Sequence, residues 1–251
     1  MYKNQEMIME QADRYLSHHY ERFPVVVVEA RGCTVTDIKG KKYLDLLAGY
    51  GSLNFGHSNQ KLYGALFDQL HKVAMVTGNF YNDTVAEFAE KLPRFTGLPE
   101  GEVLLMNTGA EAVEKAIKLC RRWAYFVKGV EPDKAEIIVS DSNFHGRTYG
   151  VLSASPVEKY RQGFGPFMPG FKFTKFGTEP YVYEDLDWCI NKNTAAFIVE
   201  PIQGEGGFIF PPDGYLKRMQ EICRRNNVLF VLDEVPTAFG RIGSSARSPL
   251  L

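Results

Sequence analysis

The stretch Ala195-Ala-Phe-Ile-Val-Glu-Pro-Ile-Gln-Gly-Glu-Gly-Gly207 joins an unbroken apolar run to a glycine-rich loop. An apolar run without alternating polar residues is typical of a strand buried on both faces of a parallel sheet. Similar short runs occur at Val103–Met106, Glu136–Val139 and Val228–Leu232, and helical patterns lie between them. Strands that alternate with helices predict βαβ units. The fold class is therefore predicted to be α/β, with a largely parallel sheet and helices on both faces.

The helices are predicted from the spacing of apolar residues. Over Glu111–Tyr125, one helical face collects Val113, Ala116, Ile117, Cys120 and Ala124. The other predicted helices are Glu6–Tyr20, Asn59–Val76, Asp83–Leu92 and Gly214–Arg225.

The N-terminal part has a different pattern, with short β-branched runs separated by Gly and Asp-x-x-Gly turns. These runs, at Val25–Ala30, Cys33–Asp37 and Lys41–Leu47, predict a small antiparallel sheet. We therefore expect three parts: a small N-terminal lobe over 1–57, a large domain over 58–243, and a divergent tail over 244–251.

Composition excludes several classes of function. The 251 residues carry 29 Lys and Arg against 30 Asp and Glu, so neither sign dominates and binding to nucleic acid or an acidic membrane through bulk charge is not expected. No apolar run approaches the roughly 18 residues of a membrane-spanning helix. The N-terminus has no signal or transit pattern, which favours the cytoplasm and leaves a mitochondrial location open. Four widely spaced cysteines predict reduced thiols, and no metal site is predicted.

Ligand sites on a parallel sheet lie beyond the carboxyl ends of its strands. Behind Val103–Met106, the segment Asn107–Ala112 leads into a helix, whose free first amides and positive dipole end favour a phosphate. The structural alternative is a capping box made by Thr108 and Glu111. Neither a dinucleotide fingerprint nor a P-loop motif is present here.

Three other strand ends carry candidate side chains. Phe144 suits stacking on a flat ring, although such a residue is more often part of a core, and Arg147 suits a carboxylate. Glu200 and Glu205 lie in the glycine-rich loop, which also fits an ordinary turn. Asp233 ends a fully apolar strand and therefore needs a cation, either a protonated ring nitrogen or a nearby arginine.

The order of these four segments resembles that of the fold-type I pyridoxal-phosphate enzymes, and within them the class III aminotransferases and their ornithine-specific branch. The similarity extends from about Tyr20 to Gly243. The most specific stretches are Leu44–His57, Met106–Ala112, Trp123–Gly129, Gly163–Gly170 and Val199–Glu205.

The resemblance implies pyridoxal 5'-phosphate as the cofactor. Gly109 and Ala110 would offer amides to its phosphate, and Phe144 would stack on its ring. Asp233 would pair with the protonated ring nitrogen, which keeps the ring an electron sink. Glu200 would support the groups around the ring. His145, where the ornithine branch more often has tryptophan, would be a neighbour of the ring.

The resemblance also implies the substrates, an amino acid and a 2-oxo acid. Arg147 would bind a carboxylate, and Glu205 would mask a second arginine in the first half-reaction. Tyr20 and Tyr50 would hold the α-amino end of ornithine, so that its δ-amino group passes to 2-oxoglutarate to give glutamate semialdehyde and glutamate. Acetylornithine and 4-aminobutyrate are the alternative donors. Members of the family are homodimers.

The sequence departs from the family at two further points. Pro236 stands where a glutamine usually bonds the ring oxygen of the cofactor, and proline has no side-chain donor. The family's Schiff-base lysine lies beyond a motif matched by Gly240–Gly243, and no lysine follows Lys217 here. We therefore expect a C-terminally truncated chain without a catalytic residue and of doubtful activity. The alternative function is a non-catalytic homologue that binds cofactor weakly or pairs with full-length subunits.

Overall fold

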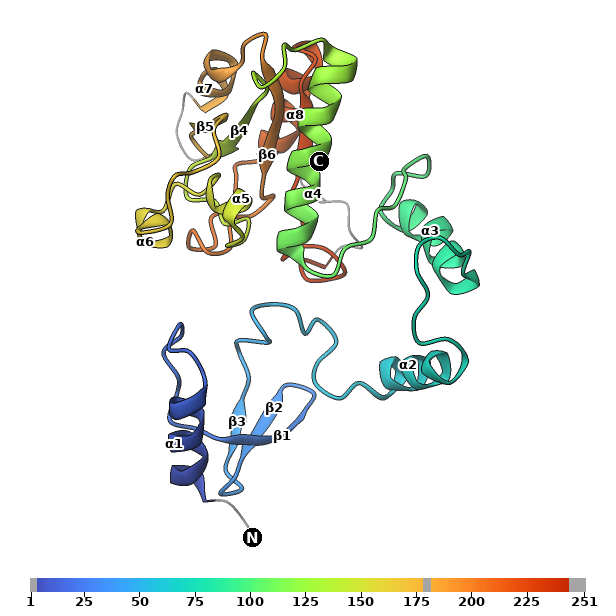
Figure 1. Cartoon of the computed structure of the whole chain (residues 1–251), viewed down its shortest axis with the longest axis vertical. Helices are drawn as coiled ribbons and strands as arrows, with labels where there is room; N and C mark the ends of the chain where they lie inside the picture. The colour runs from blue at the N-terminus through green and yellow to red at the C-terminus, as the bar shows by residue number, and fades with distance from the viewer. Residues whose placement is uncertain (1–3, 178–181, 244–251) are drawn as a thin grey trace. The chain divides into compact units, whose positions relative to one another are not determined.

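The computed structural model describes residues 4–177 and 182–243, so the predicted tail at 244–251 lies outside the described residues. The chain divides into two compact units, Met1–Asp83 and Thr84–Leu251 (Figure 1). This division falls after Asp83 rather than after His57, so residues 58–83 group with the N-terminal unit. The assignment of 58–243 to a cofactor-binding domain stays a prediction.

The N-terminal unit contains the predicted antiparallel sheet. Its strands are β1 (Val27–Arg31), β2 (Thr34–Asp37) and β3 (Lys42–Leu44), paired in the order β1-β2-β3. The turn between β2 and β3 is closed by Asp37, a buried carboxylate that accepts the backbone N–H groups of Lys39 and Lys41 and the Tyr43 hydroxyl.

Two helices complete this unit. Helix α1 (Gln5–Tyr15) is capped by Asn4 and ends five residues before the predicted end at Tyr20, because Leu16 turns to an extended conformation. Helix α2 (Gln60–Lys72) is capped by Asn59, which was predicted as the first residue of this helix. Its end is earlier than predicted, since Val73 is extended.

The second unit is built on a parallel sheet, which confirms the predicted fold class. Its strands β5 (Phe171–Thr174), β4 (Glu136–Ser140), β6 (Thr194–Val199) and β7 (Leu229–Leu232) lie in that order, and each neighbouring pair is parallel. All six residues of β6 are buried, as its unbroken apolar run predicts. Strand β5 was not predicted.

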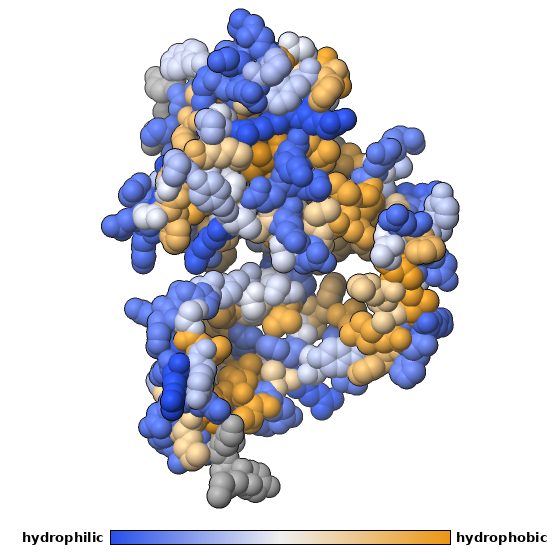
Figure 2. Space-filling view, in the orientation of Figure 1, coloured by the Kyte–Doolittle hydropathy of each residue, from blue (hydrophilic) through white to orange (hydrophobic). Residues whose placement is uncertain are grey.

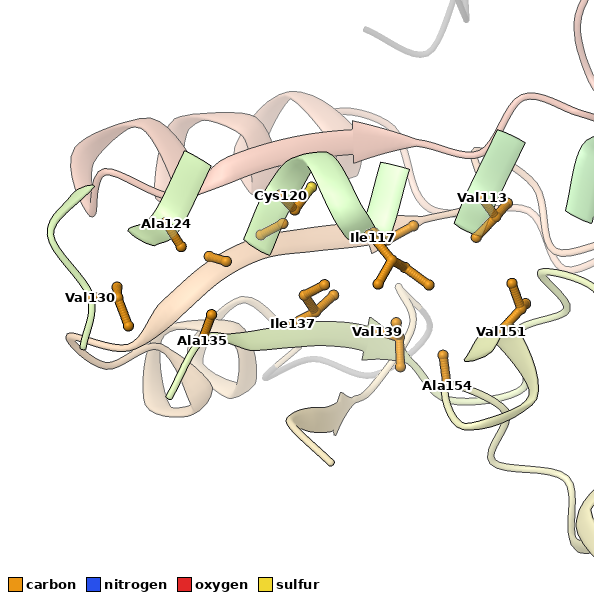
Figure 3. Packing of buried hydrophobic residues seen from close by; sticks show 13 residues of the cluster. Val113, Ile117, Cys120, Ala124, Val130, Ala135, Ile137, Val139, Val151 and Ala154 are labelled. Carbon is orange, nitrogen blue, oxygen red and sulfur yellow. The ribbon is translucent and has the colours of Figure 1, made fainter. Parts of the chain in front are cut away.

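Helices cover both faces of this sheet. Residues Ile137 and Val139 of β4 pack with one apolar cluster, and Ile138 between them packs with the other. The first cluster is covered by α4 (Gly109–Trp123) and the π-helix η1 (Ala124–Lys128), whose predicted inward face is buried except for the half-buried Ala116 (Figure 3). The second cluster lies beneath α7 (Val182–Cys189) and α8 (Tyr215–Arg225). The remaining helices are α3 (Asp83–Phe95), α5 (Tyr149–Leu152) and α6 (Glu158–Arg161).

The run Val103–Met106 is not a strand, contrary to the prediction. It belongs to no helix or sheet, and Leu104, Leu105 and Met106 are exposed. A β-strand needs a neighbour that takes its backbone hydrogen bonds. No strand within residues 4–177 and 182–243 pairs with this run, so an apolar composition alone does not make it a strand.

Two further properties of the described residues bear on function. The four cysteines are free, and burial raises the pKa of the Cys120 and Cys223 thiols to about 12. Among the helices of this part of the chain, none has the length and apolar character needed to cross a membrane.

Candidate functional site

Three of the predicted segments meet at one edge of the parallel sheet. The strands β4, β6 and β7 run in the same direction, so the segments that follow them, 141–148, 200–207 and 233–236, leave the sheet at the same edge. Two contacts tie the first two of these loops together: Gln203 Nε2 donates to the carbonyl of Asp141 at 2.5 Å, and a Cβ on Gly206 would lie 2.6 Å from the carbonyl oxygen of Ser142.

The N-terminus of α4 shows the predicted capping box. The Thr108 hydroxyl accepts the Glu111 N–H at 3.1 Å, and the Glu111 carboxylate accepts the N–H groups of Asn107 and Thr108. The box leaves the N–H groups of Gly109 and Ala110 without a hydrogen bond among the described residues. The cap and a seat for an anion are therefore compatible at this helix end.

Helix α4 begins in close contact with the loops that follow β4 and β7. A Cβ on Gly109 would lie 2.8 Å from Cγ1 of Val235, and a Cβ on Gly146 would lie 3.0 Å from that of Ala110. Distances this short are incompatible with a side chain at Gly109 unless Val235 moves. The absence of a side chain at residue 109 thus brings the free amides of α4 against the segment that carries Asp233.

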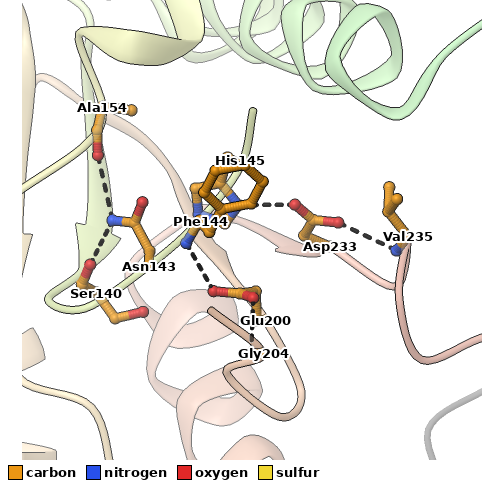
Figure 4. A network of polar contacts seen from close by, with 9 residues as sticks. All are labelled: Ser140, Asn143, Phe144, His145, Ala154, Glu200, Gly204, Asp233 and Val235. Atoms are coloured by element: carbon orange, nitrogen blue, oxygen red, sulfur yellow. Dashed lines mark hydrogen bonds and ion pairs between the residues drawn. The ribbon is translucent and has the colours of Figure 1, made fainter. Parts of the chain in front are cut away.

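Asp233 is buried and paired with His145. Its Oδ2 lies 2.7 Å from His145 Nδ1, and its Oδ1 accepts the Val235 N–H at 3.1 Å (Figure 4). The side chains of His145 and Asp233 are only 1% and 4% exposed. Among the described residues, the charged partner of Asp233 is thus His145 rather than the arginine of the structural alternative. His145 Nε2 is buried and makes no hydrogen bond within the described part of the chain.

Glu200 and Glu205 differ completely in environment. Glu200 is 2% exposed, and its two oxygens accept the N–H groups of Phe144 and Gly204 at 3.0 and 3.2 Å (Figure 4). Burial raises the pKa of Glu200, and these N–H groups and His145 only partly offset that effect. Glu205, by contrast, is exposed on the loop.

Arg147 lies between two aromatic rings. Its Cζ is 5.6 Å from the ring centroid of Phe144 and 4.7 Å from that of Tyr160, and these two rings meet edge to face. Tyr160, which lies on α6, was not predicted as a site residue. No local pattern marks it, because its contact with Arg147 depends on how α6 folds back over the loop after β4.

Tyr20 and Tyr50 come together within the N-terminal unit. Their ring centroids are 6.4 Å apart and the rings are stacked at 29°. Asp45 builds the turn before Tyr50 by accepting the N–H groups of Leu47 and Ala48, and it also contacts His57 at 2.7 Å. Tyr50 itself has a φ of +55°, a backbone conformation that costs free energy for a non-glycine residue and is frequent at functional sites.

Comparisons with known proteins show the family of the chain. The family described as aminotransferase class III matches residues 15–246, so the chain belongs to the class III aminotransferase family. Two curated relatives are ornithine aminotransferases, from Brevibacillus brevis at 51% identity and from an Exiguobacterium species at 48%. Each alignment covers 94% of this chain but only 58% and 57% of the respective relative.

Solved structures of two aminotransferases are similar to this chain. The ornithine aminotransferase of Toxoplasma gondii superposes with a TM-score of 0.92 at 39% identity, covering 98% of this chain and 57% of that one. The acetylornithine aminotransferase of Elizabethkingia anophelis gives a TM-score of 0.81 at 37% identity, with 97% and 56% covered. The chain thus spans a little over half the length of these relatives.

We predict that the substitution Gly109→Ala lowers the free energy of unfolding. Alanine in place of glycine within a helix normally gains about 1 kcal/mol, but the added methyl group overlaps Val235, and overpacking costs about 1–3 kcal/mol. Denaturant unfolding measures the difference. Gly64→Ala in α2 is the matched control, because its Cβ meets nothing within 4 Å and should stabilise. Val235→Ala should restore stability to the Gly109→Ala variant, and a Gly109→Ala variant more stable than wild type contradicts the close contact.

We also predict that Glu200 makes stability depend on pH. Because its pKa is raised in the folded state, the folded protein holds a proton that the unfolded chain releases at lower pH. Its contribution is therefore fully present below the ordinary carboxyl pKa and is lost as the pH rises through the folded-state value. The free energy of unfolding of Glu200→Gln should therefore increase relative to that of the wild type over that rise in pH. A difference that does not change with pH contradicts the raised pKa.

Proposed function

We propose that the protein to which this sequence belongs transfers the δ-amino group of ornithine to 2-oxoglutarate with pyridoxal 5'-phosphate as its cofactor. The described residues of the second unit would form the cofactor cradle. The observation that carries this proposal is the buried Asp233 carboxylate, fixed by His145 beside the free amides of α4. Membership of the class III aminotransferase family supports it.

The residues present fit such a cofactor. Asp233 has one contact at each oxygen, and a carboxylate has about four acceptor positions, so it retains capacity for a cationic N–H. The buried Nε2 of His145 also lacks a partner among the described residues. Gly109 and Ala110 present amides where a phosphate would be stabilised by the helix dipole. A cation-binding end and an anion-binding end are therefore close together.

When bound, pyridoxal phosphate supplies an electron sink for the carbanion that forms when the substrate loses a proton. The chain's own residues would orient it. His145 holds the Asp233 carboxylate in one orientation, and the N–H of Val235 holds its second oxygen. Glu200 fixes the backbone of Phe144, whose ring would stack on the cofactor. Arg147, between Phe144 and Tyr160, would bind a substrate carboxylate as a bidentate partner.

Ornithine is the proposed donor because Tyr20 and Tyr50 are stacked together, and Tyr50 is held in a strained conformation. By resemblance to the ornithine-specific branch, these two tyrosines would hold the α-amino end of ornithine and leave its δ-amino group to react. The names of the curated relatives also favour ornithine. Acetylornithine and 4-aminobutyrate remain the alternative donors.

Three other predictions remain proposals. We propose a second copy of the chain as the protein partner, because α2 has no buried residue and carries exposed apolar side chains, and Figure 2 shows hydrophobic residues over α2 and α3. The predicted cytoplasmic location stays a proposal, with a mitochondrial location as its alternative. The alternative function, a non-catalytic homologue, predicts cofactor binding without turnover of ornithine.

Replacing Asp233 tests the cofactor site. We expect titration with pyridoxal phosphate, followed by absorbance and protein fluorescence, to saturate for the wild-type chain. Asp233→Ala should weaken binding by about tenfold or more, because it removes a charge-assisted hydrogen bond. Asp213→Ala, at an exposed aspartate, is the control and should bind like wild type. No saturable binding by wild type overturns the proposed cofactor, and equal binding by Asp233→Ala overturns the role of Asp233.

Replacing Tyr50 by phenylalanine tests the donor. Tyr50→Phe keeps the ring and avoids the added strain of a β-branched residue at positive φ. The loss of one hydroxyl should weaken ornithine binding to the cofactor-loaded chain several-fold, with little change for 4-aminobutyrate. Calorimetric titration with both compounds gives the ratio of their dissociation constants. Tyr63→Phe on α2 is the control, and an unchanged ratio for Tyr50→Phe counts against ornithine.

A further inference from the structure

Glu114 connects two parts of the site through contacts that the predicted roles leave unused. It lies half-buried on α4, in the second turn after Gly109. Its Oε1 accepts the Thr148 hydroxyl at 2.6 Å and the Val151 N–H at 3.1 Å. Both donors belong to the segment that directly follows Arg147.

We propose that Glu114 is the positioning residue for Arg147: its carboxylate fixes the segment that carries this arginine to the helix that begins at the phosphate seat. The inference rests on the proposed function, in which Arg147 binds a substrate carboxylate. Glu114 acts through the backbone and touches neither cofactor nor substrate.

The contacts on either side of Arg147 explain how the link works. On one side Gly146 packs against Ala110, with a Cβ-to-Cβ distance of 3.0 Å if residue 146 had a side chain. On the other side Thr148 is held by Glu114. Both anchoring residues lie on α4, so Arg147 cannot shift relative to the start of that helix without breaking one of the two contacts.

Helix α5 depends on the same carboxylate. It has only four residues, and its N-cap Thr148 makes no side-chain cap bond of its own. Instead the Thr148 hydroxyl turns to Glu114, which also takes the Val151 N–H at the start of the helix. Glu114 therefore supplies from another helix the cap that α5 lacks.

Gly150 gives a second, independent indication. A Cβ on this residue would lie 2.5 Å from Oε2 and 2.6 Å from Oε1 of Glu114. The carboxylate thus occupies the space that any other residue at position 150 would fill. The substitution Gly150→Ala would therefore push the Glu114 carboxylate away from its position while leaving Glu114 itself unchanged.

The aromatic neighbours of Arg147 make its backbone position matter. Its guanidinium lies against Phe144 and Tyr160, and bidentate recognition of a carboxylate requires a fixed direction of the planar guanidinium. A small shift of the backbone would therefore change the direction in which the guanidinium presents its N–H groups.

The test compares Glu114→Ala, Glu114→Gln and Glu158→Ala in the full chain loaded with pyridoxal phosphate. Glutamine keeps an oxygen acceptor but removes the charge, and Glu158, exposed on α6, controls for loss of one negative charge. The measurements are the dissociation constants of 2-oxoglutarate and of pyridoxal phosphate, and the hydrogen-exchange rate of the Val151 amide.

Glu114→Ala should weaken 2-oxoglutarate binding by about tenfold and speed Val151 exchange by about tenfold, since a hydrogen-bonded carboxylate is lost. Cofactor affinity should change by less than about twofold, because the Gly109 and Ala110 amides are kept. Glu114→Gln and Glu158→Ala should stay close to wild type. A purely electrostatic role gives the opposite sign, because removal of a negative charge tightens the binding of a dianion.

A double-mutant cycle tests whether Gly150 and Glu114 act through the same contact. Gly150→Ala should weaken 2-oxoglutarate binding in the wild-type background and have no further effect in Glu114→Ala. Additive effects, unchanged or tighter binding by Glu114→Ala, or equal loss of cofactor and 2-oxoglutarate affinity each overturn the proposal. If the wild-type chain binds no 2-oxoglutarate, the proposed function fails, and an unchanged Val151 exchange rate in Glu114→Ala then overturns the link to Glu114 as well.

Discussion

The arrangement of the site depends on the close approach of the first turn of α4 to the loops that leave the parallel sheet. That approach is possible because residue 109 has no side chain to meet Val235, and because residue 146 has none to meet Ala110. A methyl group at either place would separate the helix amides from the strand ends. The anion-binding end of the helix and the buried carboxylate of Asp233 are neighbours for this reason.

Burial then determines how the polar groups are used. A carboxylate removed from water is costly unless hydrogen bonds replace its hydration. Asp233 meets this requirement with His145 and the Val235 N–H, and Glu200 with the N–H groups of Phe144 and Gly204. These bonds join the loops after β4, β6 and β7 into one network. The network fixes the positions of Asp233 and Phe144, the two residues proposed to contact the cofactor ring.

Sequence reasoning succeeded where the deciding interactions are local. The capping box of Thr108 and Glu111 depends on residues three apart, and the inward face of α4 depends on helical periodicity, so both could be predicted. It failed at Val103–Met106, because a strand is defined by its neighbour. It also missed Tyr160 and Glu114, whose contacts with the segment around Arg147 depend on tertiary packing.

The sequence alone determined the α/β class, the buried character of β4 and β6, and the order in which the candidate residues follow the strands. These properties depend on periodicity and composition along the chain. Only the tertiary structure decided that His145 is the partner of Asp233, 88 residues away, and that Glu200 is buried while Glu205 is exposed. The physical reason is that such contacts depend on which strands are neighbours and in what register, and periodicity along one segment carries no information about either.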